Sequence, residues 1–320
     1  MAMITRSDAQ ALMPEDVSRE IVQNITQESV VLSMFRRLPN MIRKQHRMPV
    51  LEALPVAGFV DGDYGLKDVS KVQWGNKFIN AEEIAVIVPI PEAVLADADY
   101  DIWGEVKPLI ISEFGRVIDA AVLFGTGRTP SVIANWPNAI IPEAILRSKA
   151  VALGSNADIA LDISEGMATV EDSGYDVTGF TAAMRIKSRL RGLRDNSNAL
   201  LFQPSLTAGT PATLYGQPIH YPRNGVWDSN EALMLGGDFN QAVYSIRQDI
   251  TYKVLDQGVL TDTDGKVLLN FSQQDSVGLR CVMRLGWQIP NPINHMDPNP
   301  DSRYPFFVLQ PEEPEEPEEP

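Results

Sequence analysis

Two stretches decide the fold: FSQQDSVGLRCVMRLG at residues 271–286 and LYGQPIHYP at residues 214–222. In the first, a polar segment rich in amides leads into an apolar run, which predicts a last long strand at 277–289. The second is an apolar strand interrupted by one glycine and two prolines. Upstream of the long strand, residues 242–255 predict a strand pair or one bent strand, and the turn TDTDGK at 261–266 predicts a hairpin.

Helical patterns occupy the middle of the chain, so the sequence predicts a mixed α+β fold. The clearest covers 101–124, where apolar residues recur at spacings of three and four (Trp103, Val106, Ile110, Phe114, Val117 and Ala121). Pro108 should kink this helix or mark a new start, and Gly125 should end it. Shorter helices are expected at 142–151, 159–172 and 180–193, and strands at 199–203, 215–220 and 232–235.

Residues 41–91 predict two long strands joined by a polar, glycine-rich tip at 60–65. The second strand should alternate between two faces, and one of these faces has the following positions: Phe78, Asn80, Glu82, Ile84, Val86, Val88 and Ile90. A hairpin this long cannot keep all its residues over its own core, and a projecting hairpin is marginal in water. We therefore expect a partner surface here, with these candidate interface residues: Lys67, Lys71, Trp74 and Lys77.

The first forty residues predict an N-terminal arm. Pro14 is a helix-start signal, and the stripe formed by Val17, Ile21 and Ile25 is too narrow to fold alone. The arm should therefore lie either on the core of its own subunit or on a neighbouring one, and these three residues are candidate contacts.

Composition excludes several classes of protein. The chain has 320 residues and a net charge of −15, and six of its negative charges lie in the last ten residues, PEEPEEPEEP. This balance argues against broad electrostatic binding of nucleic acid. No apolar run is long enough to span a membrane, and the start lacks a secretory signal. A single cysteine, Cys281, allows no intrachain disulfide and fits a reducing cytoplasm. The charged, repetitive tail should be disordered.

No pattern indicates an enzyme, a cofactor site or a metal site. His46, His220 and His295 lie in different regions without partners at metal-ligand spacing, and no G-x-S-x-G elbow occurs. The basic segment at 180–193 offers Arg185, Arg189 and Arg191 as interface residues. They could bind nucleic acid, but the segment has no interleaved aromatic residues, which favours pairing with carboxylates of the same or a neighbouring subunit.

The succession of these elements resembles the phage capsid fold of the Hong Kong 97 type. The resemblance rests on IVPIPEAVLADADYDIW (87–103), IDAAVLFGTG (118–127), GYDVTGF (174–180), LYGQPIHYP, LGGDFNQAVYSIRQDITYKV (235–254) and NFSQQDSVGLRCVMRLG (270–286). It implies these parts: an N-terminal arm (1–40), an extended hairpin loop (41–91), a peripheral domain with a spine helix (92–155), an axial domain (156–240), return strands of the peripheral domain (241–300) and a C-terminal extension with the acidic tail (301–320).

By that resemblance the chain would be a major capsid protein. Its copies would assemble as hexamers and pentamers into an icosahedral virion shell around double-stranded DNA, which is packaged without sequence-specific binding, after synthesis in the host cytoplasm. Separate scaffolding, portal and decoration proteins are possible partners; no membrane is expected. The alternatives are an encapsulin-like shell around protein cargo and an α+β enzyme.

Some members of this family cross-link a loop lysine to an asparagine of the peripheral domain, assisted by a glutamate. Here the matching downstream positions carry Gln274 and either Cys281 or Val282. We therefore expect a shell without covalent cross-links.

Overall fold

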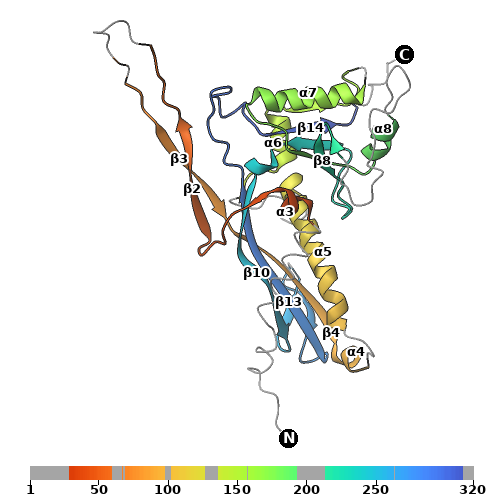
Figure 1. Cartoon of the computed structure of the whole chain (residues 1–320). Coiled ribbons are helices and arrows are strands. Elements are labelled where there is room, and N and C mark those ends of the chain that lie inside the picture. The colour runs from red at the N-terminus through yellow and green to blue at the C-terminus, as the bar shows by residue number, and fades with distance from the viewer. Residues whose placement is uncertain are drawn as a thin grey trace.

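The computed structural model describes residues 29–59, 67, 69–97, 102–126, 136–156, 158–192, 213–262 and 264–312. It is a mixed α+β fold, as the sequence predicts. A long sheet with one long helix beside it forms one end of the molecule, a compact sheet with shorter helices forms the other, and a two-stranded hairpin projects to one side (Figure 1).

The long sheet has four strands in the order β1 (Arg36–Arg37), β10 (Val243–Leu255), β13 (Ser276–Gln288) and β4 (Glu82–Pro91). β13 lies antiparallel to both β10 and β4. Its odd-numbered residues from Leu279 to Trp287 join the main core cluster, because successive side chains of a strand point to opposite faces. The predicted last long strand is confirmed. The predicted bend upstream of it corresponds to two irregularities of β10 between Ile246 and Thr251.

Helix α5 (Ile102–Leu123) covers one face of the long sheet. Ile110, Phe114 and Ile118 lie in the core shared with the sheet. The helix continues through Pro108, so the predicted new start at that residue is wrong. Gly125 has a φ of +72°, and the amide of Thr126 donates to the carbonyl oxygen of Ala120 (3.2 Å), which confirms the predicted end.

The compact sheet has six strands in the order β5 (Ala150–Ala152), β14 (Phe306–Gln310), β9 (Met234–Gly237), β6 (Gly179–Ala182), β8 (Gln217–His220) and β7 (Thr213–Leu214). Three helices accompany it: α6 (Ile140–Leu146), α7 (Ile159–Asp172) and α8 (Ile186–Gly192). α7 has the predicted bounds. β7 and β8 are joined by Tyr215 and Gly216, both with positive φ, as a tight hairpin requires.

Strand β14 joins the two cores. Phe306 and Val308 belong to the core cluster that contains α5 and the long sheet, whereas Phe307 and Leu309 belong to the cluster under α7. All four side chains are fully buried. The chain therefore packs its last described strand between both halves of the molecule.

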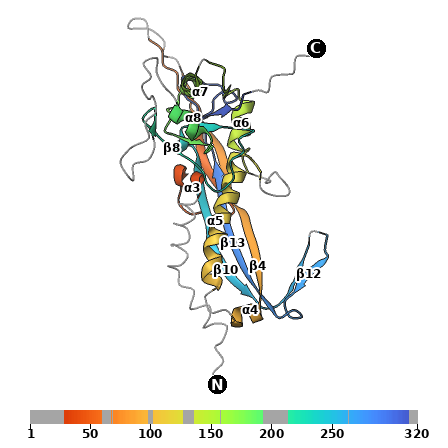
Figure 2. The same ribbon diagram turned by 90° about the vertical axis from the view of Figure 1, so that its right-hand side faces the viewer.

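The remaining elements are short helices and two hairpins. The helices are α3 (Val30–Met34), α4 (Glu92–Asp97) and the 3-10 helix η1 (Phe239–Gln241). The first hairpin pairs β2 (Gln45–Ala53) with β3 (Gln73–Asn80), and the second pairs β11 (Val259–Thr261) with β12 (Val267–Asn270). The second hairpin is the predicted one around TDTDGK, and Figure 2 shows it projecting from the end of the long sheet.

Four further predictions of local structure are wrong. The stretch 301–320, expected as an extension, contains β14. The strand expected from 78 to 90 is divided, because β3 pairs in the hairpin while β4 pairs with β13. The helix expected at 180–193 begins only at Ile186, because residues 179–182 form the fully buried strand β6. The helix expected at 142–151 ends at Leu146 and is followed by β5.

Four other predictions fall on residues outside the described ranges. They are the arm helix with Val17, Ile21 and Ile25, the hairpin tip at 60–65, the strand at 199–203 and the tail from 313 onward.

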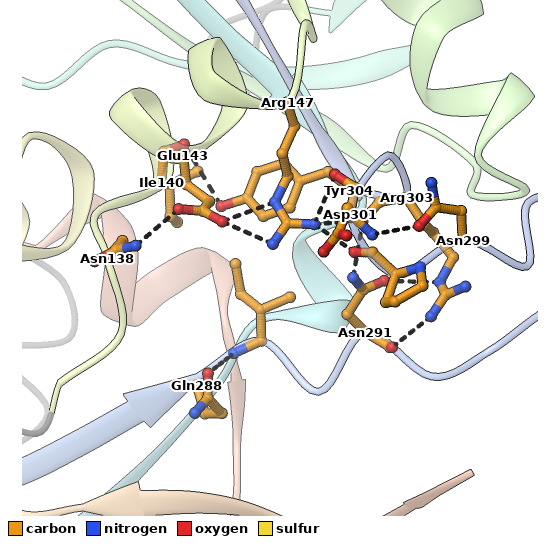
Figure 3. A network of polar contacts seen from close by, with 12 residues as sticks. Asn138, Ile140, Glu143, Arg147, Gln288, Asn291, Asn299, Asp301, Arg303 and Tyr304 are labelled. Carbon is orange, nitrogen blue, oxygen red and sulfur yellow. Dashed lines mark hydrogen bonds and ion pairs between the residues drawn. The ribbon is translucent and has the colours of Figure 1, made fainter. Parts of the chain in front are cut away.

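A polar network holds the segment between β13 and β14 at the junction of the two halves (Figure 3). The guanidinium of Arg147 forms an ion pair with Glu143 (2.7 Å), donates to the carbonyl oxygen of Pro300 (2.5 Å) and lies over the ring of Tyr304. Arg303, which is buried, donates to the side-chain oxygen of Asn291 (3.0 Å). These bonds fix the path by which the chain reaches β14.

The joint role of β14 gives a prediction. The ring of Phe307 lies against α7 and β9, because a Cβ atom added at Gly166 or Gly236 would come within about 2.5 Å of it. Phe307→Ala should lower the free energy of unfolding by about 3–5 kcal/mol, measured by urea denaturation of the unassembled subunit. Leu268→Ala, at a side chain 62% exposed on β12, is the control and should change it by less than about 0.5 kcal/mol. Equal losses in the two variants would contradict the assignment of β14 as the shared core strand.

Candidate assembly surfaces

The root of the hairpin β2–β3 is clamped to the long sheet. A Cβ atom added at Gly286 of β13 would lie 2.4 Å from the carbonyl oxygen of Asn80, so the two backbones meet closely only because this residue is glycine. The indole of Trp136 donates to the same oxygen (2.9 Å), and the side chain of Gln288 donates to the carbonyl oxygen of Phe78 (3.0 Å). A small buried cluster completes the clamp: Met41, Ile79, Ala81 and Val243.

Beyond this root the hairpin has little core. Among the described residues, the backbone hydrogen bond farthest along the hairpin that ties it to the body runs from the amide of Ile293 to the carbonyl oxygen of Leu51 (3.1 Å). Trp74, directly opposite Leu51, is 66% exposed, and Phe78 on the same face is 40% exposed. Further exposed apolar side chains follow toward the tip: Val56, Phe59, Val69 and Val72. Apolar surface of this kind, carried by a two-stranded projection, is typical of a protein contact.

The predicted interface residues fall on two separate surfaces. Lys67, Lys71, Trp74 and Lys77 are exposed on the hairpin or on its way to the tip. Arg185, Arg189 and Arg191 are exposed on or just before α8, beside the compact sheet on the other side of the molecule (Figure 1). Their placement agrees with a role in contacts, but the contacts themselves remain a prediction.

Sequence reasoning missed a third exposed surface. Val259, Val267 and Leu268 are exposed on the hairpin β11–β12, whose strands pair with each other and, within the described part of the chain, with no other strand. The sequence does show apolar residues on both sides of TDTDGK. Such residues are equally common in buried strands, so they do not by themselves predict an exposed surface.

Sequence reasoning also missed the point where the N-terminal segment is attached. Asp119 of α5 is fully buried, and its carboxylate accepts hydrogen bonds from the hydroxyl of Ser29 (2.5 Å), the amides of Val30 and Val31 (3.2 Å each) and the side chain of Asn224 (2.7 Å). Burial raises the pKa of Asp119, against the hydrogen bonds, which lower it. The first turn of α3, which lies within the stretch 1–40 that the sequence assigns to the arm, is thereby fixed to the long helix.

The histidines and the cysteine of the described ranges lie in separate places. His46 and His295 are exposed and far apart in the chain, and burial lowers the pKa of His220. Burial also raises the pKa of Cys281 to about 12, so this thiol is neutral at pH 7 and serves as a core residue. Within the described ranges no three potential metal ligands come together. Of the helices that the structure describes, none is both long and apolar enough to cross a membrane.

The comparisons with known proteins agree in finding phage proteins. The model of the phage capsid family matches residues 9–294. The major capsid protein of Staphylococcus phage 80alpha is 24% identical over 273 residues, which cover 84% of this chain and 79% of that protein. A solved structure from Microbacterium phage Oxtober96 has a TM-score of 0.77 at 36% identity, covering 97% of this chain and all of the other. One from Mycobacterium phage Adephagia also has a TM-score of 0.77, at 28% identity, covering 98% and 99%.

The anchor at Asp119 gives a testable prediction. Asp119→Asn keeps the size of the side chain but turns an amide group toward donors that already face the carboxylate. It should lower the free energy of unfolding by about 2–3 kcal/mol and speed the amide exchange of Val30 and Val31. Glu113→Gln on the same helix is the control: it breaks an exposed pair with Arg116 and should cost less than about 1 kcal/mol. Unchanged amide exchange at Val30 and Val31 in the Asp119 variant would disprove the anchor.

Proposed function

Since this chain belongs to the phage capsid family, we propose that it is a major capsid protein whose copies form the icosahedral shell of a virion. The protein is therefore a structural protein and not an enzyme. The observation in the fold that supports this function most directly is the projecting hairpin, which is rigid at its root and apolar along its exposed length.

The expected subdivision of the chain supports the same proposal, with changes at its boundaries. We assign the extended loop to β2–β3, the spine helix to α5, the peripheral domain to the long sheet and the axial domain to the compact sheet. β4 then belongs to the peripheral domain, because it pairs with β13. β14 belongs to the axial domain, because it pairs with β5 and β9. The N-terminal arm begins before α3, and Asp119 holds its root.

In the assembled shell, the hairpin of one subunit would cover an adjacent subunit. This arrangement would remove Trp74 and its apolar neighbours from water, and it would supply the core that the hairpin lacks. Repetition of such a contact around an axis gives closed rings, which we propose to be hexamers and pentamers. The acidic balance of the chain suits a shell that encloses double-stranded DNA without binding it tightly. Scaffolding, portal and decoration proteins remain possible partners.

A substitution on the hairpin should separate assembly from folding. Trp74→Ala should change the free energy of unfolding by less than about 0.5 kcal/mol, because its side chain is exposed in the subunit. It should raise the protein concentration needed for shell formation by about tenfold or more, because a central aromatic contact is lost. Light scattering and electron microscopy measure the second effect. Met296→Ala, at a side chain 70% exposed next to Gly174, is the control. Shells forming at the unchanged concentration with Trp74→Ala would contradict the role of the hairpin.

The proposed function also predicts a shell held by non-covalent contacts. A lysine–amide cross-link needs a carboxylate near the amine, whereas Cys281 and Val282, at the corresponding positions, are buried and uncharged. Purified particles should appear as closed shells containing nuclease-protected DNA. After boiling in detergent they should give a single band at 35.3 kDa. As a positive control, particles treated with a chemical cross-linker should give a ladder of bands from linked subunits on the same gel. A ladder from untreated particles would disprove the non-covalent shell, while shells filled with protein instead of DNA would contradict a virion.

A further inference from the structure

A cavity of about 180 Å³ lies between α8 and the point where the chain leaves the compact sheet. Ile186 and Leu233 form apolar parts of its wall, and Arg185 and Arg189 supply basic parts. The chain itself contributes Pro311 and Glu312, the two residues that directly follow β14. The cavity therefore combines apolar surface, positive charge and the start of the C-terminal tail.

The described part of the chain balances the positive charge of this cavity only in part, through Glu312 in its wall. Arg185 and Arg189 are exposed and four residues apart, so they lie on neighbouring turns of one face. Across the described ranges neither guanidinium has a carboxylate within ion-pair distance. The nearest segment of opposite charge along the chain is the tail, which carries five glutamates in residues 313–320.

We propose that the acidic tail, residues 313–320, binds along this cavity on the α8 of its own chain. In an extended polyproline II conformation eight residues span about 25 Å, whereas the seven residues of α8 span only about 10 Å, so the tail has sufficient reach. This conformation has three residues per turn, and the tail repeats every three residues. Its glutamates can therefore recur on constant sides of the tail and face the arginines.

The covalent connection of the tail to β14 favours binding of the tail of the same chain over binding of a tail from a neighbouring subunit. Each exposed ion pair contributes only about 0–1 kcal/mol, so a free peptide of this sequence would bind weakly. The tail, however, begins at Pro311 and Glu312, inside the cavity, and a short tether gives an effective concentration in about the millimolar range. The bound tail would cover the basic face of α8 with negative charge, so that this face would not attract nucleic acid phosphates.

Cross-linking within the full-length subunit tests this proposal. Arg189→Lys keeps the charge and introduces a primary amine, which a carbodiimide can couple to a nearby carboxylate. We expect mass spectrometry to detect a link between position 189 and the glutamates of 313–319. Its yield should be at least about fivefold above links from the tail to Lys253 or Lys266, which are exposed on the long sheet and the β11–β12 hairpin. About 0.5 M salt should reduce it strongly, because the interaction is screened.

Two outcomes of this experiment would overturn the proposal. Equal yields at Lys253, Lys266 and position 189 would show a tail without a preferred site. In a mixture of ¹⁴N- and ¹⁵N-labelled chains, links that join differently labelled chains would show that a neighbour supplies the tail.

Charge removal provides an independent measurement. Replacing the five glutamates of 313–320 by glutamine should expose the basic face, so the subunit should elute from heparin at higher salt than an equally charged control. The control carries five glutamine substitutions at exposed carboxylates elsewhere: Glu52, Glu113, Glu171, Asp256 and Asp301. Adding Arg185→Gln and Arg189→Gln to the tail variant should cancel the increase. The same retention in the tail variant and in the control would contradict the covering of α8.

Discussion

The packing of β14 is the constraint on which the rest of the structure depends. Its five residues place Phe306 and Val308 in the core of the long sheet, and Phe307 and Leu309 in the core under α7. Both cores therefore need the same strand, and neither is complete before this strand has been added. A strand so shared also prevents the two halves from sliding past each other, because any shift would open cavities in two places at once. The network around Arg147 and Arg303 fixes the approach to this strand, which couples the halves further.

Sequence reasoning predicted best those elements in which a periodic apolar pattern extends over many residues. α5, α7, β10 and β13 extend over 13 or more residues each, with a consistent apolar face. β14 was missed because a run of four apolar residues has no period, and because the charged tail beside it suggested an extension. Sequence reasoning missed the division between β3 and β4 for the opposite reason. The strand pattern continues through Ala81, although the backbone there leaves one sheet and enters another. Periodicity therefore identifies a strand but does not predict which other strand pairs with it.

The same distinction applies to the surfaces. Trp74 and the lysines of the hairpin could be predicted as exposed, since a long hairpin must leave its core. The clamp at its root could not, because it depends on Gly286 meeting Asn80, more than 200 positions away in sequence. Asp119 likewise looked like one polar residue on a helix, and only its four donors, drawn from Ser29, Val30, Val31 and Asn224, reveal an anchor. Contacts that are distant in sequence and specific in geometry leave no local pattern.

The clamp and the exposed hairpin have a joint consequence for assembly. A projection that moved freely would lose conformational entropy when it bound a neighbour, and this loss would reduce the affinity of every contact in a shell. The close contact at Gly286, the bonds from Trp136 and Gln288, and the tie at Ile293 set the direction of β2 and β3 before any partner is present. The subunit therefore bears part of the ordering cost during its own folding. What remains for assembly is mainly the burial of apolar side chains such as Trp74, a contribution that grows with every copy added to the shell.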